Sequence, residues 1–343
     1  MTKNIINQIA NKLCLSPKGI LAADESTNTI KKRFETINVE SNFENRRSYR
    51  ELLFKTEKLN EFISGVILYD ETIKQNTSEG IPFPEYLSEK GIIPGIKVDK
   101  GAIPLSKNSE EKFTEGLDGL NERLKEYKKL GAEFTKWRAI INIDSEKKYP
   151  SLYCLESNAF MLARYAKTVQ DNDMVPIVEP EVIMDGNHTI EDCFKVTSST
   201  LNKVFEQLNL HQVSLPGILL KPNMVISGTN CKEQSSVEKV AKMTIQCLEE
   251  NVPKEVPGIV FLSGGQSNEK ATLHLNEMNK LFKNLPWKLS FSYGRALQQP
   301  SISSWKGEEN NIKKSQDALF KRSKLNSSAT SGIYSLKDEQ QML

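Results

Sequence analysis

Histidine is scarce in this chain of 343 residues, and its three copies are far apart. His188, His211 and His274 form neither an HxxxH nor an HExxH spacing, so the sequence argues against a histidine-ligated metal centre. The five cysteines are odd in number and contain no CxxC pair. This pattern favours free thiols in a reducing compartment such as the cytosol.

Long apolar runs are missing as well. None approaches the about 18 residues of a membrane-spanning helix, and the N-terminus lacks the apolar centre of a signal peptide. The first arginine is Arg33, which argues against a transit peptide. Forty-six basic residues nearly cancel 44 acidic ones, leaving neither a basic stripe for nucleic acid nor a cationic face for a bilayer. We therefore expect a cytoplasmic protein with no membrane insertion and no nucleic-acid partner.

One pattern recurs along the chain: a short apolar run, usually opened by glycine or proline, ends on polar residues and is followed by a helix-like stretch. Near-continuous hydrophobicity is typical of strands buried on both faces of a parallel sheet. The eight runs span residues 19–26, 64–72, 92–101, 134–143, 174–182, 217–223, 258–265 and 287–295. Amphipathic stretches such as 116–131 and 235–250 lie between them. Eight such units predict an α/β fold, the (β/α)8 TIM barrel.

Two further helices are expected to flank this barrel. The first places Ile5, Ile6, Ile9 and Leu13 on one face, and the second runs from about Glu309 to Leu325. No linker rich in proline, glycine or serine separates the strands, so we predict one domain over 1–325. After Leu325 apolar periodicity is lost, and 326–343 is interpreted as a flexible C-terminal tail.

In barrels of this kind the active site lies at the carboxyl ends of the strands, so the polar residues that close each run are candidates. They are Asp24, Glu25, Ser26, Asp70, Asp99, Lys100, Lys136, Arg138, Glu179, Glu181, Lys221, Asn223, Ser263, Ser292 and Arg295. Lys221 directly follows an apolar strand. A desolvated amine loses proton affinity, and the neutral form attacks a carbonyl to give a Schiff base. A lone lysine here more often extends out of the rim into solvent, but Lys100 and Lys136 at neighbouring strand ends favour the nucleophile.

Carboxylates accompany these lysines. Asp24 ends the first strand, and Glu179 and Glu181 form a same-face pair in the fifth, as Lys136 and Arg138 do in the fourth. The carboxylates are either general acids and bases around a carbonyl carbon or salt-bridge partners in a polar barrel mouth, and their spacing alone leaves both interpretations open.

The seventh and eighth runs end in LSGGQS (262–267) and SYGRAL (292–297). Barrels commonly bind phosphate at these places through backbone N–H groups and helix N-termini. Gly264 and Gly265 allow a close backbone approach, and the Arg295 guanidinium suits a bidentate phosphate contact. The two loops together predict a phosphate site.

GILAADEST, GIKVDKG, KWR, VPIVEPE, LLKPNM, FLSGGQS and SYGRAL stand in the order and spacing of the class I, Schiff-base fructose-bisphosphate aldolases, and the chain resembles that family over about 1–335. The resemblance implies reversible cleavage of fructose 1,6-bisphosphate to dihydroxyacetone phosphate and glyceraldehyde 3-phosphate, in glycolysis and gluconeogenesis. It implies a metal-independent lyase without a cofactor, in a cytoplasmic homotetramer.

The resemblance also implies residue roles. Lys221 forms the Schiff base, Glu179 transfers protons with the help of Lys136, Asp24 removes the proton of the C4 hydroxyl, and Glu181 supports the network. One phosphate is expected at Ser263, Gly264, Gly294 and Arg295, and the other toward Ser26, Arg33, Lys100 and Arg138.

Two departures from the family pattern stand out. Pro216 replaces a usual acidic residue ahead of Gly217, and the last tyrosine is Tyr334, whereas the family typically ends in a tyrosine on a flexible tail. The tail therefore looks shortened, and we expect slower protonation of the enamine. Two alternatives stay open: a scaffold that mainly binds a cytoskeletal or adaptor partner, and another Schiff-base barrel enzyme acting on a different sugar phosphate.

Overall fold

Eight parallel strands close into a barrel in the computed structural model, which describes residues 2–341. Around the barrel the strand order is β1-β10-β9-β8-β7-β6-β3-β2. The strands are β1 (Gly19–Ala22), β2 (Ile63–Leu68), β3 (Ile93–Lys97), β6 (Phe134–Ile141), β7 (Val175–Val182), β8 (Leu219–Leu220), β9 (Gly258–Phe261) and β10 (Lys288–Tyr293). Seven lie within their predicted runs and β2 begins one residue before its run, so the predicted α/β (β/α)8 fold is confirmed.

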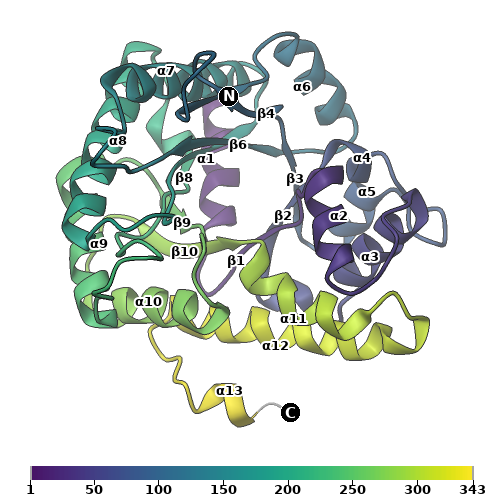
Figure 1. The fold of residues 1–343 in the computed structure, drawn as a ribbon. Coiled ribbons are helices and arrows are strands. Elements are labelled where there is room, and N and C mark those ends of the chain that lie inside the picture. The colour runs from purple at the N-terminus through teal and green to yellow at the C-terminus, as the bar shows by residue number, and fades with distance from the viewer. Residues whose placement is uncertain (1, 342–343) are drawn as a thin grey trace.

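Helices surround these strands (Figure 1). They are α1 (Thr2–Leu13), α2 (Thr27–Glu35), α3 (Phe43–Phe54), α4 (Asp70–Ile73), α5 (Phe83–Glu89), α6 (Leu120–Lys129), α7 (Leu152–Gln170), α8 (Ile190–Leu210), α9 (Val237–Asn251), α10 (Asn268–Leu281), α11 (Arg295–Trp305), α12 (Ile312–Thr330) and α13 (Asp338–Gln341). Several begin at a side chain that accepts a hydrogen bond from the N–H three residues ahead, such as Ser26 before α2 and Thr189 before α8.

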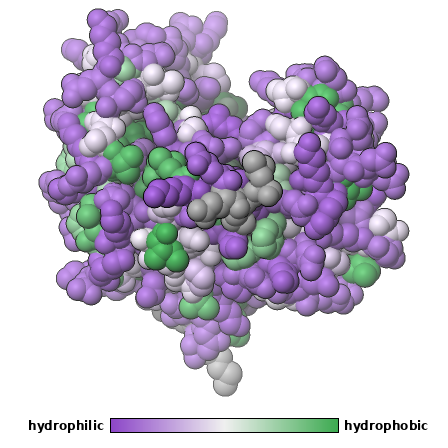
Figure 2. Space-filling model, turned by 90° about the horizontal axis from the view of Figure 1, so that it is seen from below, coloured by the Kyte–Doolittle hydropathy of each residue, from purple (hydrophilic) through white to green (hydrophobic). Residues whose placement is uncertain are grey.

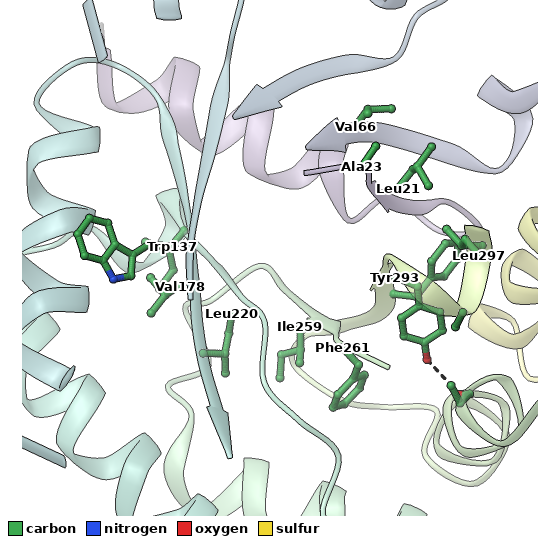
Figure 3. Close-up of a cluster of buried hydrophobic side chains, with 14 of the residues drawn as sticks. Leu21, Ala23, Val66, Trp137, Val178, Leu220, Ile259, Phe261, Tyr293 and Leu297 are labelled. Carbon is green, nitrogen blue, oxygen red and sulfur yellow. Dashed lines mark hydrogen bonds between the residues drawn. The ribbon is translucent and has the colours of Figure 1, made fainter. Parts of the chain in front are cut away.

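Alternate residues of each strand belong to two separate cores. Leu21, Val66, Trp137 and Tyr293 point outward and pack beneath the helices (Figure 3). The phenol of Tyr293 donates a hydrogen bond to the carbonyl of Ala271 on α10, which ties the last strand to its neighbouring helix. The outer core thus joins the ring of helices to the barrel.

The inner core lies at the amino end of the barrel, where α1 closes it. Ile6, Ile9 and Leu13 of α1 pack against inward-facing residues of the strands, among them Ile20 and Phe134. Ile5 was expected on this face, but its side chain is 51% exposed. The cause is helical periodicity, since the buried positions recur every three to four residues and Ile5 lies about 100° away from Ile6.

The connection after β3 differs from the expected pattern. The third run was expected to extend to residue 101, but the strand ends at Lys97. Gly101–Pro104 forms β4, which pairs antiparallel with β5 (Lys112–Glu115) in a hairpin outside the barrel. Lys100 therefore lies in the turn into this hairpin rather than on the barrel strand.

The C-terminal helix also differs from the expectation. A 3-10 turn (Glu309–Asn311) leads into α12, which continues to Thr330 rather than ending at Leu325. Several of the polar residues that suggested a tail are buried: Asn326 is fully covered and accepts a hydrogen bond from the Thr272 hydroxyl. Residues 342 and 343, the end of the predicted tail, lie outside the described residues.

Exposed apolar side chains occur at several places on the surface, and three of them, Leu152, Tyr153 and Phe160, lie on α7. Figure 2 shows a predominantly hydrophilic face with separate apolar spots. Across residues 2–341, no helix has the length and apolar character needed to span a bilayer.

Candidate active site

A cavity of about 690 Å³ opens at the carboxyl ends of the strands. Its lining includes all thirteen residues predicted for catalysis or substrate binding. They are Asp24, Ser26, Arg33, Lys100, Lys136, Arg138, Glu179, Glu181, Lys221, Ser263, Gly264, Gly294 and Arg295. Eight basic and six acidic side chains line this cavity, which favours an anionic ligand.

Lys221 follows β8 and is buried at the base of the cavity. Its side chain is 5% exposed, and its Nζ lies 3.2 Å from Oε1 of Glu179. Glu179 comes from the adjacent strand β7 and is equally buried. A buried amine beside a buried carboxylate can pass its proton to that carboxylate, which produces the neutral nucleophile.

Lys136 from β6 lies among three carboxylates. Its Nζ is 2.7 Å from Asp24, 3.4 Å from Glu179 and 4.0 Å from Asp99. Burial alone would lower the pKa of Lys136, but these three carboxylates outweigh burial and hold the pKa above its usual value. Lys136 therefore remains a cation at neutral pH.

Asp24 lies just beyond β1 on the other side of Lys136. Burial acts to raise the pKa of its carboxyl, but the charges of Lys136 and Lys221 bring the pKa well below its usual value. Asp24 is thus an ionised carboxylate at the base of the cavity and can accept a proton from a bound hydroxyl.

Ser292 on β10 lines the cavity, and its buried Oγ has neither a hydrogen-bond nor an ion-pair partner within the described part of the chain. Oε2 of Glu179 makes no hydrogen bond there either, but it lies 3.4 Å from the ammonium of Lys136. Buried polar groups are normally paired, so the Ser292 hydroxyl suits a polar ligand. Nearer the rim, the guanidinium of Arg138 on β6 forms an ion pair with Glu181 on the adjacent strand β7.

In the loop between β9 and α10, carbonyl groups accept hydrogen bonds from other groups of the protein. The Ser263 carbonyl accepts from the backbone and side chain of Gln266, and Arg295 donates to the carbonyls of Gly264 and Gln266. The N–H groups of Gly264 and Gly265 donate to no acceptor among residues 2–341. Gly264 has φ of 55°, a left-handed conformation, and consecutive free N–H groups of this kind form an anion site.

The side chain of Gln266 links this loop to α10. Its Oε1 lies 2.6 Å from Nδ1 of His274, a buried histidine on α10. Burial and the charge of Lys270 lower the pKa of His274 to about 4, so the ring is neutral at physiological pH. Gly294 precedes α11 and adds a helix N-terminus beside the loop.

The sequence-based selection missed Lys97, which lines the cavity. Lys97 Nζ lies 2.6 Å from Oδ1 of Asp99, and Oδ2 of Asp99 accepts from the backbone N–H of Arg138. Asp99 was collected as a strand-end residue without a role. The signal for the pair was its i, i+2 spacing within the third predicted run, which would place both residues on one face of an extended segment. In the structure β3 ends at Lys97, and Asp99 lies just beyond it.

Comparisons with known proteins agree along the whole chain. The family model described as fructose-bisphosphate aldolase class-I matches residues 5–343. A protein of Xanthomonas campestris pv. campestris, described as a probable fructose-bisphosphate aldolase class 1, is 54% identical over 326 residues, which cover 95% of this chain and 97% of the relative. The fructose-bisphosphate aldolase of Dictyostelium discoideum is 52% identical over 318 residues, covering 92% of this chain and 89% of the relative.

A solved structure is also similar over nearly the whole chain. The fructose-bisphosphate aldolase of Plasmodium falciparum, in a complex with TRAP and a small-molecule inhibitor, superposes with a TM-score of 0.96 at 48% identity and covers 97% of this chain and 96% of its own. The chain therefore belongs to the class I fructose-bisphosphate aldolases, lyases that cleave fructose 1,6-bisphosphate reversibly into dihydroxyacetone phosphate and glyceraldehyde 3-phosphate.

Proposed function

We propose that Lys221 is the residue that forms the Schiff base with the ketose carbonyl in this aldolase. The observation that carries the proposal is the 3.2 Å approach of its Nζ to Glu179 in a buried part of the cavity. Glu179 takes the ammonium proton of Lys221 and returns it to the hydroxyl of the carbinolamine, which leaves as water. The nitrogen then carries the positive charge of an iminium ion.

Carbon–carbon cleavage follows from this charge. The iminium nitrogen withdraws electrons from the bond between C3 and C4, while Asp24 removes the proton of the C4 hydroxyl. The bond breaks to give an enamine and an aldehyde, and glyceraldehyde 3-phosphate leaves first. Lys136 supports both steps as a fixed cation 2.7 Å from Asp24 and 3.4 Å from Glu179. Glu181 orients Arg138 through their ion pair.

The two phosphates bind at opposite sides of the amine. Ser263, Gly264, Gly294 and Arg295 hold one, and Ser26, Arg33, Lys100 and Arg138 hold the other. Lys221 directly follows β8, which is next to β9, and the Leu262 N–H donates to the Pro222 carbonyl, so the β9 loop adjoins the nucleophile. The phosphate on C1, beside the reacting C2, therefore belongs to the β9 loop, and the phosphate on C6 belongs to the second set.

Trapping tests the assignment of the nucleophile. Incubation with dihydroxyacetone phosphate and borohydride reduces the imine to a stable amine, and peptide mass mapping should place one three-carbon adduct on Lys221. An adduct mainly on Lys100 or Lys136 would show that the nucleophile is assigned wrongly. The amine of Lys313, which is 71% exposed and does not line the cavity, is the control for non-specific labelling.

We also propose that the enzyme is a metal-independent cytoplasmic homotetramer. Leu152, Tyr153 and Phe160 support the assembly, since they lie on α7 with side chains 65%, 64% and 47% exposed. Light scattering after size-exclusion chromatography measures the mass directly, and a monomeric mass would contradict the proposal. A cytoskeletal or adaptor partner stays a prediction from the sequence.

A further inference from the structure

Glu25 lies beside Asp24 and is held between two arginines. Its Oε1 is 2.5 Å from Arg33 on α2, and its Oε2 is 2.7 Å from Arg50 on α3. The side chain of Glu25 is 5% exposed, so this carboxylate is buried. Burial acts to raise the pKa of Glu25, but the two guanidinium groups outweigh it and lower the pKa, which keeps Glu25 ionised.

The two arginines differ in their access to the cavity. The side chain of Arg33 is 21% exposed and lines the cavity, whereas that of Arg50 is 3% exposed and does not line it. Arg33 can therefore turn toward a bound ligand. Arg50 is confined, because its helix packs through Tyr49 against Trp305, with ring centroids 5.3 Å apart.

Glu25 itself is fixed by a further contact. Gln298 on α11 donates from Nε2 to Glu25 at 2.8 Å and to the Ala22 carbonyl at 2.7 Å. Its Oε1 accepts from the hydroxyl of Tyr49. The carboxylate thus keeps a hydrogen-bond donor and the charge of Arg50 even when Arg33 moves away.

We propose that Glu25 and Arg50 are positioning residues that let Arg33 change partners, from the Glu25 carboxylate in the free enzyme to the C6 phosphate of the bound substrate. The inference rests on the proposed phosphate site at Arg33. Without Arg50, a departing Arg33 would leave a buried carboxylate with no counter-ion, which is costly. With Arg50 in place the charge of Glu25 stays compensated, and Arg33 is available to the phosphate.

The proposed partner exchange predicts how each variant changes the binding of the C6 phosphate by Arg33. Arg50→Met makes Glu25 depend on Arg33 alone, so the phosphate competes less well for Arg33. Glu25→Gln removes the competing charge, so Arg33 binds phosphate more readily. The measured quantity is the specificity ratio, defined as kcat/KM for fructose 1,6-bisphosphate divided by kcat/KM for fructose 1-phosphate. Both substrates use the same amine and the same C1 phosphate site, so the ratio isolates the C6 phosphate.

We expect Arg50→Met to lower the specificity ratio roughly 10-fold, equivalent to about 1.4 kcal/mol, and Glu25→Gln to raise it by about threefold. The double variant Glu25→Gln/Arg50→Met removes both buried charges, so it should fold even if Arg50→Met does not, and its ratio should match that of Glu25→Gln. Arg47→Met is the matched control: Arg47 also lies on α3 but pairs with Glu44 and Glu51. A merely structural role of Arg50 would change stability without moving the ratio.

Variants made in an Arg33→Ala protein test the phosphate site and the partner exchange separately. Arg33→Ala should lower the ratio by itself, and Arg50→Met should then have no further effect on it. If Arg33→Ala leaves the ratio unchanged, the phosphate site is placed wrongly and the partner exchange falls with it. If Arg33→Ala lowers the ratio while neither Arg50→Met nor Glu25→Gln changes it, the phosphate site stands and the partner exchange is overturned.

Discussion

The two ends of the barrel use the same inward face of the strands for different purposes. In β6, Phe134 belongs to the apolar core at the amino end, and Lys136, two residues on, lies among the carboxylates of the cavity. In β7, Ile177 is followed in the same way by Glu179. Because alternate residues share a face, each of these two strands changes from apolar to charged along its inward face.

The residues that stabilise the barrel and the residues that line the cavity therefore lie at opposite ends of the barrel. The amino end is an apolar plug closed by α1, whereas the carboxyl end contains buried charges that compensate one another. Buried ion pairs contribute little net stability, so they are best explained by the reaction they serve. Substitutions at the two ends should therefore affect different measurements.

Lys221→Met at the carboxyl end should have the largest effect. Removing the amine removes the covalent intermediate, so kcat should fall on the order of 10³-fold or more. Cleavage of fructose 1,6-bisphosphate is the assay, and circular dichroism should show a folded protein. Turnover within tenfold of the parent enzyme would mean that another group forms the intermediate.

Asp24→Asn should affect one step and leave another intact. Asparagine keeps the shape but cannot accept the proton of the C4 hydroxyl, so cleavage should slow by roughly 10² to 10⁴-fold. Schiff-base formation needs no base at C4, so borohydride should still trap dihydroxyacetone phosphate on Lys221. Loss of trapping together with cleavage would place Asp24 in imine formation instead.

Much of this arrangement could be predicted from the sequence. The strands were recognisable because both faces are apolar until the charged residues begin, and the thirteen site residues follow strand ends or family motifs. The role proposed for Arg50 could not be predicted from the sequence, because nothing local distinguishes it from Arg46 and Arg47 on the same helix. Only the tertiary packing gives each of these arginines its own partner.

The end of α12 was missed for a related reason. Asn326 and Thr330 look like tail residues in the sequence, but both are buried. The amide of Asn326 accepts from Thr272, and the hydroxyl of Thr330 donates to the Ser327 carbonyl. A polar residue can be buried when its hydrogen bonds are satisfied, and the partner on α10 is 54 residues away in the chain.

Leu13→Ala tests the amino end. Leu13 is fully buried in the plug, so its truncation should lower the free energy of unfolding by about 2 to 5 kcal/mol. KM should stay within twofold of the parent value, because the cavity lies at the other end. Urea unfolding gives the stability, and Ile5→Ala, at a 51% exposed position on the same helix, is the control expected to be nearly neutral. A large rise in KM for Leu13→Ala would break the separation of the two ends.

Tyr334→Phe should have a smaller effect. The hydroxyl of Tyr334 donates to Glu339 at 2.7 Å, and Glu339 also pairs with Arg322 on α12. Its backbone N–H donates to Asn276 on α10, so Tyr334 is held against the helices. Losing one hydrogen bond should cost about 1 kcal/mol of stability and leave turnover within twofold. A tenfold loss of turnover with unchanged stability would instead make Tyr334 part of the reaction.

Removal of metal ions by a chelator should have the smallest effect. This experiment tests whether the charged residues at the carboxyl end act without a metal ion. At the base of the cavity, the cations Lys97, Lys136 and Lys221 face the anions Asp24, Asp99 and Glu179, and the iminium nitrogen supplies the electron-withdrawing charge. The three histidines lie elsewhere: none lines the cavity, and His274 is engaged by Gln266. Prolonged treatment with EDTA should therefore leave kcat and KM unchanged. If activity were lost and then restored by zinc, a metal ion rather than the lysine imine would be withdrawing the electrons, and the buried charges at this end would need a different explanation.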